Sequence, residues 1–321
     1  MEIIRTIDMK DIKLERILVP VSLCGDGEDA LKQAVYFRKK LASKITLIHV
    51  TPSASNLRSI VQTELNKRLQ ARAMVRLIRF AKIHFKGRIP DNVELRVEIG
   101  QYVPVIIEVA NKENFNLLII RKSDRIEGLA GKLKKHSADR IVRECHCPVL
   151  SLKDRWTYRG LRTVLVPVDI RRQSRDLLLW SIFLGKTLGV RISLISVLTV
   201  NIELEKSLAY KKAKLLERSI RAEGIDCESR MFENKKGTKM DTFLQYAKNE
   251  KADLVLIQGA QDILFGDSQG ENYASKILHE SIKPVFRLGA GNEGFFKDLL
   301  GANVPISLQS EMTNQKEPTF A

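Results

Sequence analysis

The chain has 321 residues, of which 54 are basic and 38 acidic, so its formal net charge is +16. At about 100 to 200 residues per domain, this length predicts two domains. A hydrophobic fraction of 44% excludes a disordered chain, and no apolar stretch approaches the roughly 20 residues that cross a bilayer. Because the N-terminus has no signal-peptide pattern and the chain has only four cysteines, we expect a cytoplasmic protein.

Short apolar runs rich in Val, Ile and Leu alternate with helical patterns along the chain. Runs that are apolar throughout suit strands buried on both faces. The expected strands are 16–21, 44–50, 92–99, 116–121, 147–152, 163–168, 190–197, 225–233, 253–258 and 283–288. The expected helices are 26–42, 56–87, 102–113, 132–145, 172–188, 202–223, 240–250 and 270–281. This alternation predicts a doubly wound α/β fold with parallel sheets.

The sequence contains the same unit twice. The run ILVPV at 17–21 returns as VLVPV at 164–168, shifted by 147, and CPVLSL at 147–152 returns as KPVFRL at 283–288, shifted by 136. The smaller shift at the end indicates a deletion of about ten residues, which we place in the second helix of the second copy. The repeat divides the chain into a domain at 1–153, a linker at 154–161, a second domain at 162–288 and a tail at 289–321.

Several of these motifs resemble the universal stress protein family, and the duplication resembles its tandem two-domain members. The motifs are the ILVPV first strand, the IHV of the second strand around His49, and the CPVL last strand that follows ADRIVR at 138–143. The SDRIE run at 123–127 is similar to the first half of E-type tandem members. The resemblance implies two Rossmann-like domains, each with a five-stranded parallel sheet, paired as a pseudo-dimer. Together with the absence of a catalytic constellation, the duplicated fold favours a non-catalytic binding or regulatory protein of stress adaptation, for which a homodimer is the expected assembly.

Many members of this family bind ATP with an acidic residue after strand 1, backbone at the end of strand 2 and a glycine loop after strand 4. The resemblance assigns six candidate residues to these places: Ser22, Val50, Arg121 and Lys135 in the first copy, and Asp169 and Val197 in the second. The loop glycines are missing or wrongly spaced in both copies. Since a Cβ blocks the close approach that glycine gives to a phosphate, we expect the ATP grip to be lost or weakened and no cofactor to be required.

One alternative function stays open for each copy. In the second copy, Asp169 supplies the expected acid, which favours a nucleotide-binding protein with weak ATPase activity. In the first copy, the loop that includes Arg121 and Lys135 is rich in basic residues and could hold a small anionic ligand through its side chains.

The long helix expected at 56–87 places four arginines on one face. Arg68, Arg72, Arg76 and Arg79 follow one another at spacings of four, four and three residues. This pattern is typical either of a solvated outer face or of a surface for a polyanion, either nucleic acid or an anionic lipid membrane. Aromatic residues make up only 6% of the chain and no nucleic-acid motif accompanies the charge, so we favour the solvated face.

No residue pattern points to a catalytic or metal centre. Cys145, His146 and Cys147 lack the further ligands that a tetrahedral zinc site needs, and no base can be assigned to either thiol. His49 lies within an apolar strand and is expected to pack in the core. The sequence therefore predicts a protein that is not an enzyme and holds no metal.

Overall fold

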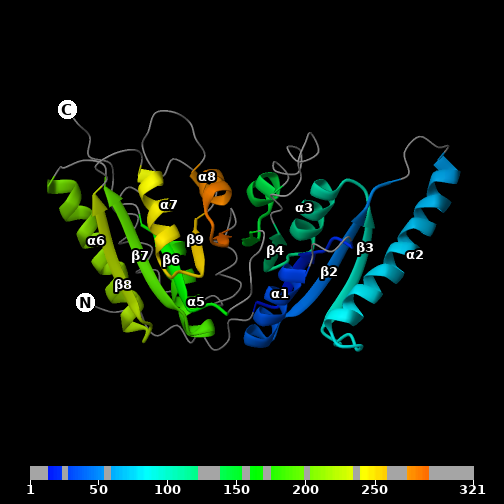
Figure 1. The fold of residues 1–321 in the computed structure, drawn as a ribbon, viewed down its shortest axis with the longest axis horizontal. Helices are drawn as coiled ribbons and strands as arrows, with labels where there is room; N and C mark the ends of the chain where they lie inside the picture. The colour runs from blue at the N-terminus through cyan, green and yellow to red at the C-terminus, as the bar shows by residue number, and fades with distance from the viewer. Residues whose placement is uncertain are drawn as a thin grey trace.

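The computed structural model describes residues 14–23, 28–53, 59–121, 138–153, 160–168, 175–198, 203–233, 239–258 and 273–288. Within these residues the strands form one sheet of ten, in the order β3-β2-β1-β4-β5-β10-β9-β6-β7-β8. Figure 1 shows the two halves of this sheet side by side, each with its own helices. The predicted tandem α/β fold is confirmed.

Each half contributes five strands that pair in parallel with their neighbours. The strands of the first half are β1 (Arg16–Pro20), β2 (Lys44–Thr51), β3 (Val93–Ile99), β4 (Leu117–Arg121) and β5 (Val149–Leu152). Those of the second half are β6 (Thr163–Pro167), β7 (Arg191–Leu198), β8 (Cys227–Glu233), β9 (Leu254–Ile257) and β10 (Val285–Arg287). The halves meet where β5 and β10 pair in antiparallel fashion.

The helices form one layer on each face of the sheet. They are α1 (Glu28–Leu41), α2 (Ser59–His84), α3 (Tyr102–Lys112), α5 (Arg175–Leu188), α6 (Glu203–Ala222), α7 (Lys239–Asn249) and α8 (Tyr273–Glu280), and residues 138–144 are also helical. Two apolar clusters separate the layers from the sheet, one under α1, α2, α5 and α6 and the other under α3, α7, α8 and 138–144. Each cluster contains residues of both halves, so the two domains share their core.

The junction between the halves has an approximate twofold axis. Leu150 of β5 pairs with Phe286 of β10, and these two residues occupy the same place in the repeat. The polar contacts around this axis do not follow the symmetry. Lys153 Nζ donates to the carbonyl oxygen of His279 at 2.6 Å, while the buried Arg287 donates to the carbonyl oxygen of Val142.

The shortening of the second copy is not confined to its second helix, contrary to the prediction from the repeat spacing. The interval from the start of β2 to the start of β3 is 49 residues, and the matching interval from β7 to β8 is 36. Helix α2 has 26 residues and α6 has 20, which accounts for six of the thirteen residues removed. After the helix, eight residues lead to β3 but only four lead to β8, so four more are missing there, where a change of length leaves the packed helix face intact.

Candidate ligand site at the carboxyl ends of the strands

The parallel register brings three of the predicted residues together in the first half. Pro20 pairs with Ile48, which places Ser22 and Val50 two residues further along at the same level. Arg121 is the last residue of β4, the neighbour of β1 on the other side. Ser22 is exposed, whereas Val50 and Arg121 are half-buried. Ligands of open α/β sheets bind beyond this edge, so the three residues lie where a ligand would approach.

His49 fixes the backbone at the end of β1. The Val21 N–H donates to the carbonyl oxygen of Ile48 at 2.9 Å, and His49 Nδ1 lies 3.0 Å from the carbonyl oxygen of Val21. Because a carbonyl can only accept, Nδ1 carries the proton in this contact. His49 is half-buried rather than fully packed in the core, and its ring supports the strand end that precedes Ser22.

The second half repeats this strand end with different side chains. The Val168 N–H donates to the carbonyl oxygen of Ile195 at 2.8 Å, as Val21 does to Ile48. Val197 is only 6% exposed, so its backbone is the part that a ligand could contact. The buried Ser196 takes the place of His49. Asp169 and Lys135, the two other predicted residues, lie outside the described residues.

Cys145 and Cys147, which precede β5, are buried and poorly reactive. Burial raises the pKa of the Cys145 thiol to about 12 and raises the pKa of Cys147 well above its ordinary value. Both side chains therefore stay protonated at neutral pH, and a protonated thiol is a poor nucleophile and a poor metal ligand. In the part of the chain that the structure describes, no group of three or more His, Cys, Asp or Glu side chains could hold a metal ion.

The four predicted arginines of α2 are exposed, as expected. Arg68, Arg72, Arg76 and Arg79 lie on the outer side of the helix. The opposite side is buried and is made of Ala73, Leu77 and Ala81. None of the described helices has the length and apolarity that a membrane-spanning helix needs.

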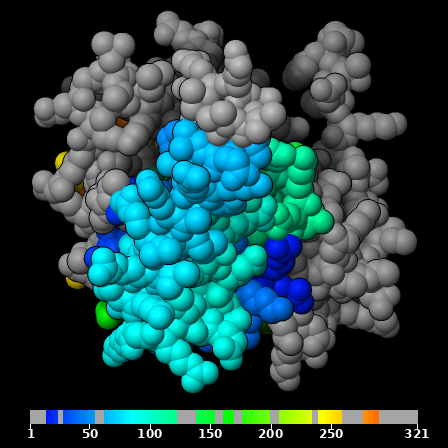
Figure 2. All heavy atoms as spheres, turned by 90° about the vertical axis from the view of Figure 1, so that its right-hand side faces the viewer, coloured from blue at the N-terminus to red at the C-terminus, as the bar shows by residue number. Residues whose placement is uncertain are grey.

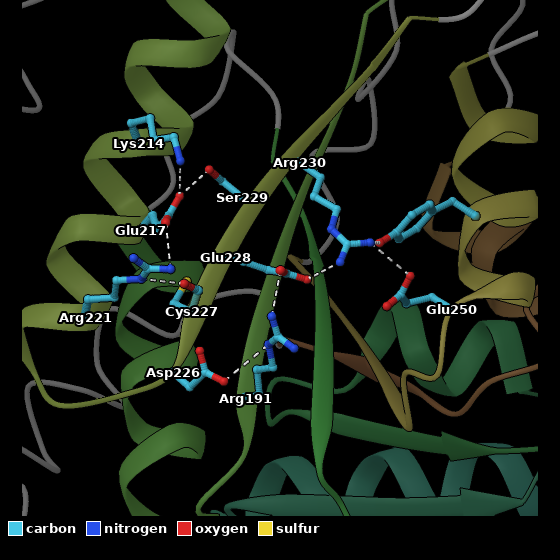
Figure 3. A network of polar contacts seen from close by, with 11 residues as sticks. Arg191, Lys214, Glu217, Arg221, Asp226, Cys227, Glu228, Ser229, Arg230 and Glu250 are labelled. Atoms are coloured by element: carbon cyan, nitrogen blue, oxygen red, sulfur yellow. Dashed lines mark hydrogen bonds and ion pairs between the residues drawn. The ribbon is translucent and has the colours of Figure 1, made fainter.

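A polar network that no sequence pattern predicted connects α6 to β8 (Figure 3). Glu217 of α6 accepts from Lys214 at 2.8 Å and from Ser229 of β8, and Arg221 lies 3.1 Å from it. Burial acts to raise the pKa of Glu217, but these donors and the neighbouring positive charges lower it below its ordinary value. One buried carboxylate thus pairs with two cations of α6, the partly buried Lys214 and the exposed Arg221.

Comparison of the two copies reveals duplicated polar contacts that the sequence repeat could have located. The side chain of Asn116 accepts from the N–H of Arg16 at 2.9 Å, just before β4. At the equivalent place before β9, Asp253 accepts from the N–H of Thr163 at 3.1 Å. Polar residues that recur at the repeat spacing, directly before a buried strand, would have indicated these contacts.

A cavity lies between α1 and the end of α2 rather than at the strand ends. It has a volume of about 270 Å³ and is lined by Leu31, Lys32, Val35, Tyr36, Lys39 and His84. Lys32 is held by Glu28 at 2.6 Å, and Tyr36 packs edge-on against Phe37. The cavity is therefore separate from the candidate site.

Solved structures with the same tandem arrangement cover nearly the whole chain. A universal stress protein from Archaeoglobus fulgidus DSM 4304 matches 88% of this chain and 98% of its own, with a TM-score of 0.63 and 17% identity. A protein from Pseudomonas aeruginosa UCBPP-PA14, described as a universal stress protein, matches 95% of this chain and 99% of its own, with a TM-score of 0.57 and 18% identity. A protein of unknown function from Pseudomonas aeruginosa PAO1 matches 96% and 99%, with a TM-score of 0.55 and 17% identity.

A protein-family model matches the sequence of the first half of the chain. A comparison with curated protein sequences found no significant match. The model of the universal stress protein family matches residues 13–153, which is the first copy of the repeat. Residues 13–153 are therefore a domain of the universal stress protein family, and the chain as a whole has the tandem fold of the solved proteins above.

Proposed function

We propose that the whole chain is a tandem universal stress protein that acts in stress adaptation as a non-catalytic binding or regulatory protein in the cytoplasm. The observation that carries this proposal is the side chain that follows β1. The resemblance places an acidic residue there, and the first copy has the exposed Ser22. A neutral hydroxyl makes hydrogen bonds about half as strong as those of a carboxylate, so Ser22 weakens the grip on a nucleotide.

The described residues around this strand end also support a role without turnover. Of the candidate residues that the structure describes here, Val50 is apolar and Arg121 is a cation, so neither of these two side chains is a nucleophile. His49, the nearest imidazole in sequence, uses Nδ1 to bind the carbonyl oxygen of Val21. The candidate site can thus bind an anion through Arg121 more readily than it can activate water.

A measurement of ATP turnover and binding on the purified full chain tests this proposal. We expect no phosphate release above the enzyme-free rate and no tight nucleotide in native mass spectra. Steady-state hydrolysis of ATP, or nucleotide that co-purifies with the protein, would contradict it. The Asp169→Ala variant identifies activity that comes from the second half, and Ser22→Ala is its matched control at the equivalent place in the first half.

A second candidate is nucleotide binding with weak ATPase activity through the second half. It is favoured by the end of β6, which repeats the backbone contact of β1 at 2.8 Å and is followed in sequence by Asp169. If this candidate is right, ATP raises the melting temperature of the wild type and of Ser22→Ala but not that of Asp169→Ala. Equal shifts in all three proteins would exclude Asp169 as the residue responsible.

The expected homodimer stays a prediction. Since β5 and β10 pair with each other inside one chain, a second chain has to use another surface. Native mass spectrometry gives the mass of the assembly directly.

A further inference from the structure

The outer side of α2 is strongly cationic. Apart from Lys67, six basic side chains are exposed along α2 and the turn after it: Arg68, Arg72, Arg76, Arg79, Lys82 and Lys86. The helix has one acidic residue, Glu64, and its carboxylate is paired with Lys67 at 3.0 Å. Figure 2 shows the end of the molecule that α2 forms, with the helix lying across it in blue to cyan. We call these six residues the basic face.

Two aliphatic side chains are exposed among the cations of the basic face. Val75 is 68% exposed and Ile83 is 69% exposed. At 100° per residue, positions 75 and 83 point in the same general direction as Arg68, Arg72 and Arg79. They are therefore not the margin of the buried side, which is formed by Leu77 and its neighbours.

The basic face lacks the compensation that α6 has at the other end of the molecule. In α6, the carboxylate of Glu217 lies 2.8 Å from Lys214 and 3.1 Å from Arg221 (Figure 3). Among the residues that the structure describes, no acidic side chain lies within ion-pair distance of Arg68, Arg72, Arg76 or Arg79. A surface that carries many phosphates would complement these four guanidinium groups, because Arg binds phosphate in a bidentate manner.

We propose that the basic face docks on an anionic lipid membrane. A helix of 26 residues is about 39 Å long, and α2 can lie flat along the bilayer at the end of the molecule. The arginines then contact lipid phosphates, while Val75 and Ile83 enter the layer between the headgroups. Apolar side chains within a cationic face gain from this contact because they leave water, whereas contact with a polyphosphate strand would leave them hydrated.

The polar side chains of α2 argue against nucleic acid as the occupant. Gln70 donates to the carbonyl oxygen of Val97 at 2.7 Å, and Gln62 and Asn66 lie 3.3 and 3.4 Å from Ser53 Oγ. These amides are turned to the protein and do not offer their donors and acceptors to base edges. Phe80 is half-buried against His84, so no described aromatic ring of the helix stands free to stack on a base.

A second copy of the chain is also a poor occupant. The exposed side of α6, the equivalent helix of the other half, carries Lys211 and Arg218. Contact between α2 of one chain and α2 or α6 of another would therefore bring like charges together, which opposes association.

Vesicle sedimentation with the full-length protein tests the proposal. The probes are vesicles of phosphatidylcholine alone and vesicles with 30% phosphatidylglycerol, each about 100 nm wide. We expect binding only to the anionic vesicles, a loss of at least about tenfold in Arg72→Glu/Arg76→Glu, and weakening at high salt. The matched control is Lys211→Glu/Arg218→Glu, which changes the net charge equally on α6 and should retain binding to within about twofold.

A third variant separates a membrane from a nucleic acid. Val75→Ser/Ile83→Ser keeps every charge, so it should weaken vesicle binding several-fold and leave binding to a 20-nucleotide RNA or DNA unchanged. Circular dichroism checks that each variant is folded. The proposal is overturned if wild-type protein does not bind anionic vesicles, if both charge-reversal pairs lose binding equally, or if the serine variant binds vesicles as well as wild type does.

Discussion

Gly185 of α5 lies against the side chain of Ile225, just before β8. A Cβ added at Gly185 would lie 2.6 Å from Cγ2, 2.7 Å from Cδ1 and 2.9 Å from Cγ1 of Ile225. Ile225 is buried, so its side chain has little room to move away. The close approach of α5 to the segment that enters β8 thus depends on the absence of a side chain at residue 185.

We predict that Gly185→Ala lowers the free energy of unfolding by about 1–3 kcal/mol, the usual cost of overpacking. In an open helix the same change would stabilise by about 0.5–1 kcal/mol, so the sign of the effect reports the contact. Urea denaturation measures it. Ile225→Val removes Cδ1 and should recover part of the loss when combined with Gly185→Ala. Simple additivity of the two changes would contradict this explanation.

At the scale of residues, the sequence predicts the position of a residue in the fold better than it predicts the contacts of its side chain. The apolar runs correctly located the strand that ends near Ser22, because burial on both faces leaves a continuous apolar pattern. It did not predict that His49 would support this strand end, since that contact depends on how far β2 extends past β1. The contact of Gly185 with Ile225 joins two elements of the fold and leaves no local signal.

The outermost strands of the sheet, β3 and β8, each carry an arginine that forms ion pairs with two glutamates. Arg96 of β3 pairs with Glu98 at 2.6 Å and with Glu113, which follows α3. Arg230 of β8 pairs with Glu228 at 2.9 Å and lies 3.5 Å from Glu250, which follows α7. Charges of this kind on an edge strand discourage it from pairing with another sheet.

We predict a pH-dependent loss of stability in Glu113→Gln. The hydrogen bond from Arg96 holds the pKa of Glu113 below its ordinary value. A carboxyl group whose pKa is lower in the folded state than in the unfolded state stabilises the fold at pH values above its unfolded pKa. This stabilisation is lost as the pH falls through the folded-state pKa. The pair is partly exposed, so the loss at pH 7 should be at most about 1 kcal/mol, and it should be smaller at pH 3.5.

Urea denaturation at both pH values measures this effect. The control is Glu108→Gln, which removes an exposed pair with Lys112 and should change little at either pH. A loss in Glu113→Gln that is equal at pH 7 and pH 3.5 would show that the charge of the carboxylate is not responsible.

At the scale of elements, helix faces were predictable and helix lengths were not. The spacing of the arginines correctly placed them on the exposed side of α2, because a helix repeats every 3.6 residues. The deletion in the second copy was placed wholly within its second helix, yet α6 is only six residues shorter than α2. Sequence offsets give the sum of all changes between two matched strands and do not assign them to a helix or to its flanks.

The whole molecule has one core layer on each face of the sheet, and both layers run through the two halves. Phe37 and Leu77 of the first half belong to the same cluster as Trp180 and Phe286 of the second. The ring of Trp180 lies 5.2 Å from that of Phe286, next to the junction. A shared core of this kind couples the unfolding of one half to that of the other.

We predict that a cavity made in the first half destabilises the second half equally. Leu77→Ala removes a fully buried side chain of α2 and should cost about 2–5 kcal/mol. In a Trp156→Phe background, the fluorescence of Trp180 reports the second half alone. The unfolding midpoint measured there should fall together with that of the far-ultraviolet circular dichroism. A midpoint for Trp180 that does not move would mean that the halves unfold independently.

At this scale the sequence predicted two paired sheets, and the repeat explains why. Each copy contains the strands of a complete five-stranded sheet. The antiparallel pairing of β5 with β10, which joins the two halves, was not predictable in detail. The two strands pair through backbone groups, which every sequence possesses. The candidate site was predictable only as a set of strand ends, and its loop residues Lys135 and Asp169 remain outside the described structure.

The join of β5 to β10 within one chain has a consequence for how the protein evolves. In an assembly of two identical chains, each substitution appears on both sides of the axis and must suit both. Here the axis is only approximate, because the repeat places Gly289 opposite Lys153 and Ser151 opposite Arg287. The two halves can therefore diverge independently, so the strand ends of the first and the second copy need not bind the same ligand.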